Sequence, residues 1–133
     1  MKVELAKSAG FCFGVEKAVN TVYEEAKKND EIVYTLGPII HNEEVVKDMK
    51  RCGVEAVNIE DLNSLPKGTV IIRSHGVSKD VYNFVKHSGH RVVDATCPFV
   101  KKIHKLAREY SEDPNNKIVI IGSKHHPEVI GIS

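Results

Sequence analysis

Short apolar runs alternate with amphipathic segments along this chain, and this alternation predicts strands and helices in turn. The apolar runs are rich in Val and Ile, as is typical of buried strands in a parallel sheet. We predict strands over Val3–Ala6, Ile32–Leu36, Val54–Val57, Thr69–Arg73, Arg91–Val93 and Lys117–Ile121. Because helical patterns fall between most of these runs, the sequence predicts an α/β fold with a parallel sheet flanked by helices.

Four segments carry apolar residues at the spacing of a helix face. They contain the sets Val15, Ala18, Val19, Val22 and Ala26; Val45, Val46, Met49 and Cys52; Val81, Phe84 and Val85; and Val100, Ile103, Leu106 and Ala107. Gly53 and Gly89 follow the second and third sets, where glycine commonly ends a helix. Pro98 precedes the fourth set, as is usual for a first helical position. We therefore expect Cys52 to lie on a buried helix face as a small hydrophobic residue.

Composition narrows the class of protein. With 133 residues, the chain is long enough for a compact domain with its own core. Lys plus Arg number 19 and Asp plus Glu number 18, a net charge of +1 that argues against general binding to nucleic acid or acidic membranes. No apolar run approaches the roughly 20 residues of a membrane span. Glu4 and Lys7 interrupt the N-terminus, which is not a secretion signal.

The cysteine count and the end of the chain lead to two further expectations. Three cysteines form an odd, low number without a secretory context, so a reducing cytoplasm fits better than a disulfide framework. The sequence stops at "HHPEVIGIS", where a new helix begins, and we expect it to be a fragment of a longer protein.

Five reactive side chains fall where a predicted strand gives way to a predicted helix. They are Cys12, His41, His75, Cys97 and His126. In a parallel sheet these junctions gather at the carboxyl edge, where ligands bind in such folds. Helix N-termini at this edge favour anions, and they stabilise thiolate, the form of cysteine that binds metal. Two thiols and three imidazoles at one edge indicate a soft metal centre beside an anion site.

Other interpretations of these residues stay open. Free cysteines are often small buried hydrophobic residues, and Cys12 and Cys97 lie far apart without the C-x-x-C spacing of zinc or ferredoxin motifs. The chain could therefore be a zinc or regulatory binding module, or an α/β interaction domain with buried thiols. His87, His90 and His104 are interpreted as solvated surface residues, and His125 is left open.

The motifs around these residues resemble a known family. In order, they are "GFCFGVEKAV", "HNEEVV", "RSHGVS", "DATCPFVKKIH" and "HHPEVIG", and they run from residue 10 to residue 131. Together they are similar to the LytB/IspH family, the 4-hydroxy-3-methylbut-2-enyl diphosphate reductases. This family carries out the last step of the methylerythritol phosphate route to isoprenoids.

The resemblance implies an iron–sulfur enzyme. Family members hold a [4Fe-4S] cluster by three cysteines, at the centre of three similar α/β domains. Cys12 and Cys97 match two of these ligands, and the third would lie beyond this chain. The cluster iron without a protein thiolate binds the substrate hydroxyl. Two electrons, from reduced ferredoxin or flavodoxin, and protons then remove that hydroxyl to give isopentenyl and dimethylallyl diphosphate.

The resemblance also assigns roles to the histidines and to one glutamate. His41, His75 and His126 match the residues that contact the substrate's diphosphate, and Glu128 matches the glutamate that delivers protons. Glu128 has a plainer interpretation as a carboxylate that stabilises a helix dipole. By the same resemblance, residues 1–95 form the first domain, whose N-terminal strand packs with a missing domain. Residues 96–133 begin the second domain, so the chain alone should be inactive.

Overall fold

The architecture is an α/β sheet with helices on both faces. The computed structural model describes residues 1–28 and 31–133. Within them, the strands are β1 (Ile32–Leu36), β2 (Val54–Val57), β3 (Gly68–Ile72) and β4 (Arg91–Asp94), in the sheet order β2-β1-β3-β4. All three neighbouring pairs are parallel. The prediction of an α/β fold with a parallel sheet is confirmed.

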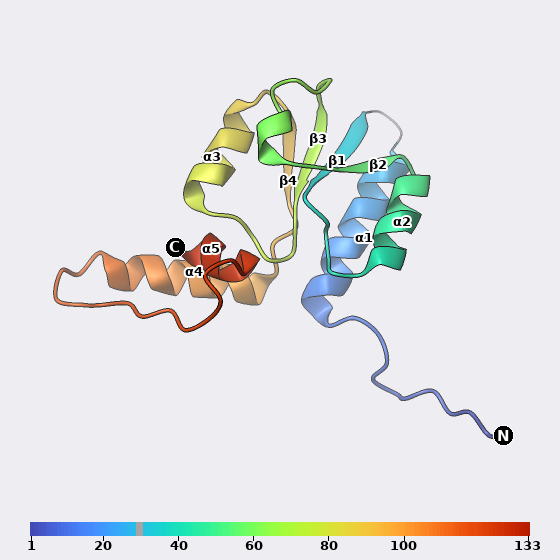
Figure 1. Cartoon of the computed structure of the whole chain (residues 1–133), viewed down its shortest axis with the longest axis horizontal. Helices are drawn as coiled ribbons and strands as arrows, with labels where there is room; N and C mark the ends of the chain where they lie inside the picture. The colour runs from blue at the N-terminus through green and yellow to red at the C-terminus, as the bar shows by residue number, and fades with distance from the viewer. Residues whose placement is uncertain (29–30) are drawn as a thin grey trace.

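Each face of the sheet carries its own helices (Figure 1). Helices α1 (Phe13–Lys27) and α2 (Glu43–Arg51) cover one face. Helix α3 (Lys79–His87) and the short 3-10 helix η1 (Ile59–Asp61) cover the other. The two cores are built from Ala18, Val19, Val22, Val33, Ile39, Ile40, Met49, Val54, Ile71 and Ala95 on the first face, and from Tyr34, Leu36, Val57, Leu62, Val70 and Val85 on the second. Most of these residues belong to the apolar runs and helix stripes that the sequence pattern predicts, but the predicted stripe of Val100, Ile103, Leu106 and Ala107 is in neither core.

Local capping fixes where the helices begin and end. The Asn42 Oδ1 accepts hydrogen bonds from the backbone N–H groups of Glu44 and Val45, at 3.1 and 3.2 Å, and so begins α2. Ser78 caps α3 in the same way. Gly53 and Gly89 follow α2 and α3 with φ of 82° and 80°, a left-handed conformation that glycine adopts without strain. Both predicted glycine stops are confirmed.

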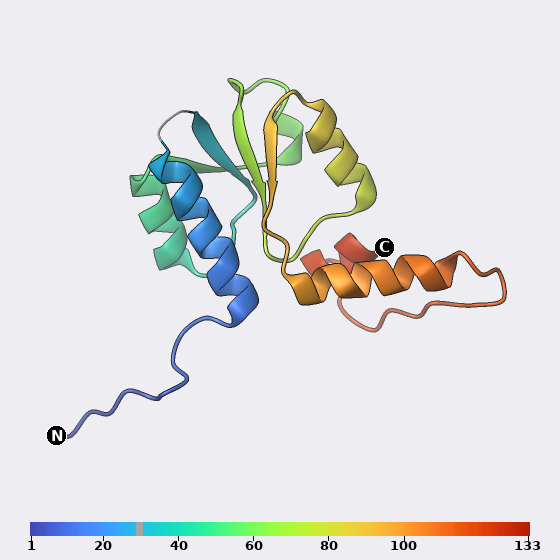
Figure 2. The same cartoon turned by 180° about the vertical axis from the view of Figure 1, so that it is seen from behind.

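The last two helices lie beside the sheet rather than on it. Helix α4 (Pro98–Ser111) projects away from the end of β4, and α5 (Pro127–Ile132) packs against it (Figure 2). Helix α4 leaves large apolar side chains exposed, among them Phe99 at 71% and Tyr110 at 60%. Among the described residues, no helix has both the length and the apolar composition to cross a bilayer.

Two predicted strands are wrong in this structure. Val3–Ala6 and Lys117–Ile121 have no strand assignment, and both segments are exposed to solvent. Val3 is 81% exposed and Ile121 is 96% exposed. A strand is stable only when neighbouring strands pair with its backbone and its apolar side chains are covered. Among residues 1–28 and 31–133, neither segment has such a partner.

Two predicted environments are also wrong. Cys52 is exposed, because it is the C-cap of α2 and lies just past the buried stripe of that helix. His90 is buried rather than solvated. Its Nδ1 accepts from the Gly68 N–H at 3.3 Å, so its Nε2 carries the proton and donates to the Leu62 carbonyl at 2.8 Å. His90 therefore has a structural role: it ties β3 to the segment after η1.

Candidate functional site

Three imidazoles from three different junctions lie together at the carboxyl edge of the sheet. His41 follows β1, His75 follows β3, and His126 is the N-cap residue of α5. The ring centroids of His41 and His75 are 5.1 Å apart, and those of His75 and His126 are 6.2 Å apart. The structure thus brings together the three histidines that the sequence analysis singled out, with His75 in the middle.

His75 is the most enclosed of the three. It is half-buried, whereas His41 and His126 are exposed. Its Nδ1 is buried without a hydrogen-bond partner among the described residues. Burial lowers the pKa of His75 below its ordinary value, and the neighbouring His41 and Arg73 lower it further. The lowered pKa favours the neutral form of His75 near pH 7, and a negative charge close to the ring would favour the protonated form.

His126 presents one defined face to the site. Its Nδ1 accepts a hydrogen bond from the Glu128 backbone N–H at 3.2 Å, so the ring proton lies on Nε2. That Nε2–H is free to donate to a ligand. The half-buried Glu128 carboxylate is one of the charges that act on His75, where it raises the pKa against the other effects. Glu128 therefore belongs to the same electrostatic neighbourhood as the histidines.

The two cysteines begin two helices that touch. Cys12 is the N-cap of α1 and Cys97 is the N-cap of α4, and neither side chain makes a capping hydrogen bond. Cys97 occupies the space beside Gly14, in the first turn of α1, where any other residue would place its side chain. A Cβ added at Gly14 would lie 2.9 Å from the Cβ of Cys97. The thiols are therefore held at two adjoining helix N-termini, with Cys12 exposed and Cys97 half-buried.

A buried serine that sequence reasoning missed links the two halves of this edge. Ser74 is 4% exposed and precedes His75. Its carbonyl accepts the Cys97 N–H at 2.9 Å, and its hydroxyl donates to the Ile39 carbonyl, near His41, at 3.4 Å. One residue thus ties the His41 loop, the His75 turn and the start of α4 together. The only signal in the sequence was its position within "RSHGVS".

Arg73 was also missed. It follows β3, and its Nε is buried without a hydrogen-bond partner in the part of the chain that the structure describes. Burial lowers the pKa of Arg73, and the guanidinium still adds positive charge beside His75. Gly37 makes room for it, since a Cβ there would lie 3.2 Å from an Arg73 Nη atom. A cation at a strand end beside a histidine is a signal that sequence reasoning could have used.

The described residues hold only part of a metal-ligand set. Within residues 1–28 and 31–133, no three His, Cys, Asp or Glu side chains are placed to share one metal ion. A structural zinc site takes four such ligands, and iron–sulfur clusters are held mainly by several cysteine thiolates. Cys12 and Cys97 fit a cluster as two of its ligands, because their sulfurs make no capping bond and lie at helix N-termini.

Comparison with known proteins shows which family the chain belongs to. The sequence profile of the LytB protein matches residues 3–133. The chain belongs to the LytB family. It is 49% identical over 135 residues to the 4-hydroxy-3-methylbut-2-enyl diphosphate reductase of Caldanaerobacter subterraneus subsp. tengcongensis, covering 100% of this chain and 46% of that protein. It is 51% identical over 134 residues to the reductase of the same name from Alkaliphilus oremlandii, covering 100% of this chain and 47% of the relative.

Solved structures share the fold. One is (E)-4-hydroxy-3-methyl-but-2-enyl diphosphate reductase, described as the terminal enzyme of the non-mevalonate pathway, with a TM-score of 0.82 and 43% identity. The match covers 96% of this chain and 44% of that one. The E-1-hydroxy-2-methyl-but-2-enyl-4-diphosphate reductase from Plasmodium falciparum has a TM-score of 0.85 and 35% identity, over 95% of this chain and 39% of that one. This chain therefore spans about half the length of the curated relatives it matches.

Proposed function

We propose that this chain is the N-terminal portion of an iron–sulfur reductase that converts 4-hydroxy-3-methylbut-2-enyl diphosphate to isopentenyl and dimethylallyl diphosphate. The observation that carries the proposal is the meeting of His41, His75 and His126, in a chain of the LytB family that also places Cys12 and Cys97 at helix N-termini. The test is to purify the full-length protein without oxygen and assay it with this substrate and a reductant. Colourless, inactive protein would contradict the proposal.

In this proposal Cys12 and Cys97 hold a [4Fe-4S] cluster together with a cysteine outside this chain. When bound, the cluster supplies electrons and a Lewis-acidic iron for the departure of a hydroxyl group. The contribution of this chain is to present the sulfurs of Cys12 and Cys97 at the N-termini of α1 and α4. The contact between Gly14 and Cys97 fixes the two helix starts against each other.

The histidines bind the diphosphate of the substrate. A diphosphate carries several negative charges and accepts hydrogen bonds, and protonated imidazole donates from both nitrogens. His126 offers its Nε2–H, because its Nδ1 already caps α5. Arg73 adds a fixed positive charge beside His75. Glu128, next to this group, carries the proton that turns departing hydroxide into water.

The partners and the location in the cell follow the family resemblance. Reduced ferredoxin or flavodoxin supplies the electrons, the substrate is a small allylic diphosphate, and the enzyme works in the cytoplasm. The net charge of +1 supports a protein that binds neither nucleic acid nor membranes.

Residues 96–133 begin a second α/β unit, whereas residues 1–95 form the first. The support is the apolar surface that α4 and the following segment leave uncovered. It includes Phe99, Ile103, Tyr110, Val119 and Ile121. Contiguous apolar surface of this kind marks a place where another part of the protein packs. The segments Val3–Ala6 and Lys117–Ile121 keep the Val- and Ile-rich pattern of strands, and we propose that strands outside this chain pair with them.

A chain restricted to residues 1–133 should not retain a cluster. Two thiolates leave the iron open to water and to exchange, whereas protein clusters are usually held by more cysteines. Iron and sulfide should therefore separate from the reconstituted chain on gel filtration, while they stay with the full-length protein. Stoichiometric iron and sulfide in the eluted 133-residue chain would contradict the prediction.

Each of the changes His41→Phe, His75→Phe and His126→Phe should weaken diphosphate binding in the full-length protein. Phenylalanine keeps the ring but has no N–H to donate, and a hydrogen bond to a charged group is worth about 1.5–3 kcal/mol. This corresponds to a loss of roughly 10- to 150-fold in affinity for inorganic diphosphate, measured by calorimetry. Iron content should stay at the wild-type level. Loss of iron would instead favour a ligand role for the histidines.

The pH dependence of diphosphate binding tests whether His75 becomes protonated in the complex. Since burial, His41, Arg73 and His126 hold its pKa below 6.5, and only Glu128 opposes them, the free protein has a neutral His75 at pH 7. Diphosphate favours the charged ring, so binding should take up a proton, and affinity should rise as pH falls toward about 6. His75→Phe should flatten this rise. An unchanged slope would show that another group titrates.

A further inference from the structure

A fourth histidine, His104, lies directly behind the three at the edge. It comes from α4, and its ring packs between two glycine backbones. A Cβ added at Gly76 would lie 3.0 Å from its Cε1. A Cβ added at Gly131 would lie 3.2 Å from Cε1 and 3.3 Å from Nε2. The ring therefore fills the space between the turn that follows His75 and the helix that begins after His126.

The turn that follows His75 and helix α5 also lie close to each other. The carbonyl oxygen of His75 would lie 3.7 Å from a Cβ at Gly131, so the His75 turn also touches α5. The His104 Nε2 is buried and has no hydrogen-bond partner among the described residues. A methyl group at either position would lie 3.0 to 3.3 Å from the ring, so the ring or α5 would have to shift.

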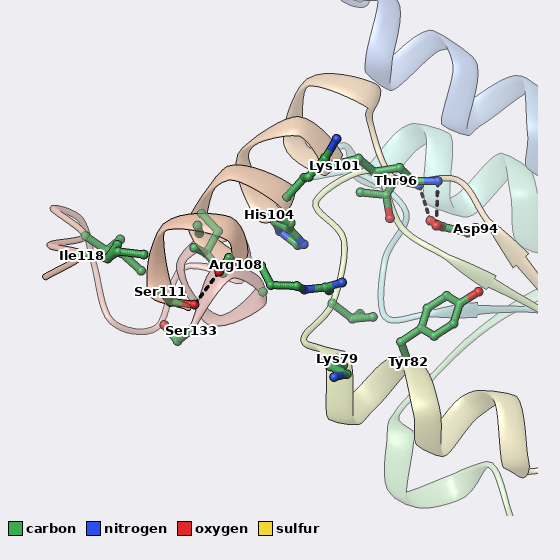
Figure 3. A pocket seen from close by; sticks show the side chains of 16 residues that line it. Lys79, Tyr82, Asp94, Thr96, Lys101, His104, Arg108, Ser111, Ile118 and Ser133 are labelled. Carbon is green, nitrogen blue, oxygen red and sulfur yellow. Dashed lines mark hydrogen bonds and ion pairs between the residues drawn. The ribbon is translucent and has the colours of Figure 1, made fainter. Parts of the chain in front are cut away.

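The other side of His104 is open. Figure 3 shows its ring pointing from α4 into a pocket of about 690 Å³ that Lys79, Lys101 and Arg108 also line. Of these cations, Lys101 is paired with Asp94 at 2.7 Å and borders the same pocket. Because this side of the ring faces the pocket, its contacts with Gly76 and Gly131 are the ones that position it.

We propose that His104 is a positioning residue that sets the spacing between the His75 turn and α5, and so the spacing between His75 and His126. The inference rests on the proposed function, because the spacing matters through the diphosphate that both rings bind. His104 does not touch the ligand in this scheme. It acts as a spacer of fixed size whose removal lets α5 move relative to the turn, and the loss of one hydrogen bond to the diphosphate from a displaced ring should cost about 10- to 150-fold in affinity.

The first test measures binding of inorganic diphosphate to the full-length protein. His104→Ala should weaken it by about 10- to 100-fold, with iron content unchanged. His104→Gln keeps most of the volume and a donor, and it should recover most of the affinity. In the substrate assay KM should rise more than kcat falls. His87→Ala is the matched control, since His87 is an exposed histidine on α3, and it should bind like the wild type.

The second test is a double-mutant cycle with Gly131→Ala. Gly131 lies within α5 without a positive φ, so its backbone accepts alanine. The added methyl group should press on the His104 ring and weaken binding by about tenfold or more. In the His104→Ala background the methyl group occupies the vacated space, so the same change should cost much less. Additive losses would overturn the inference, since residues that touch are expected to couple.

The outcomes distinguish a failure of the His104 proposal from a failure of the proposed function. If the wild-type full-length protein binds no diphosphate, the proposed function fails. If the wild type binds but His104→Ala binds equally well, only the role of His104 is wrong. If His104→Ala does not fold, as judged by its thermal melt, the Gly131→Ala and His104→Gln variants decide. Wild-type affinity in Gly131→Ala, or a loss of about tenfold or more in a folded His104→Gln, would overturn the spacer role.

Discussion

Replacing Cys12 or Cys97 by serine in the full-length protein should remove most of the visible absorbance of the cluster. Serine is nearly the size of cysteine and is itself favoured at a helix N-cap, so the fold should persist. What the change removes is the soft thiolate that iron prefers. Each variant should contain less than about half the iron of the wild type, because a cluster that loses one of its few thiolates becomes labile. Absorbance and iron content are measured on the anaerobically purified protein.

Cys52→Ser provides the matched control. Cys52 is exposed at the C-terminal end of α2, whereas Cys12 and Cys97 are helix N-caps. The N–H group of Cys52 already bonds the last carbonyls of its helix, so this residue lies at the carbonyl end of α2 rather than at a helix N-terminus. Its variant should keep wild-type iron and colour. Equal loss in all three variants, or no loss in any, would show that the assignment of the cluster ligands is wrong.

The sequence was sufficient to predict the sheet and its flanking helices. The four strands that formed are those whose apolar runs have parallel neighbours within the chain, such as Val33 opposite Val54 and Thr69. The same periodicity also suggested strands at Val3–Ala6 and Lys117–Ile121, which the structure leaves unpaired and exposed. Period alone cannot distinguish a run that has a partner from one that lacks it, because pairing depends on residues distant in sequence.

The gathering of His41 and His75 could be predicted because it depends on topology, whereas His126 reaches the same place without a preceding strand in this structure. Junctions that follow parallel strands must meet at one edge, and the residue types at those junctions can be read directly. The supporting residues could not be predicted in this way. Ser74 acts through one hydroxyl and one carbonyl, and Gly14 acts through the absence of a side chain. Such roles depend on three-dimensional contacts that leave no period or motif in the sequence.

The histidines show how burial separates residues that look alike in sequence. His87 and His90 are close in the chain, yet His87 is exposed and bonds the Asn83 carbonyl of its own helix, whereas His90 is buried and bonds two other segments. His104 was interpreted as a surface residue because it lies on a predicted helix. The structure instead buries its Nε2 and packs its ring between two glycines. The burial of His104 depends on glycines in other segments, and the apolar pattern of its own helix contains no information about them.

Glu128→Gln should leave the full-length protein folded and loaded with its cluster, yet slow its turnover by at least about a hundredfold. Glutamine keeps the size and the hydrogen-bonding capacity of glutamate, but it cannot take up and release a proton. Departing hydroxide is a poor leaving group, and its protonation in the transition state is typically worth about 10²–10⁴-fold. The carboxylate is well placed for this, since it is half-buried and acts electrostatically on His75, in the middle of the three imidazoles.

The competing role for Glu128 predicts a different pattern in the same sample. Glu128 lies in the first turn of α5, where a carboxylate stabilises the helix dipole by about 0.3–1 kcal/mol. If that were its only role, Glu128→Gln would lower the melting temperature slightly and leave turnover near normal. Its backbone N–H would still cap α5 through His126 in either case, so the helix itself should survive the change. A slow enzyme with an unchanged melting temperature and normal diphosphate affinity supports proton delivery, and a normal rate with a lower melting temperature rules it out.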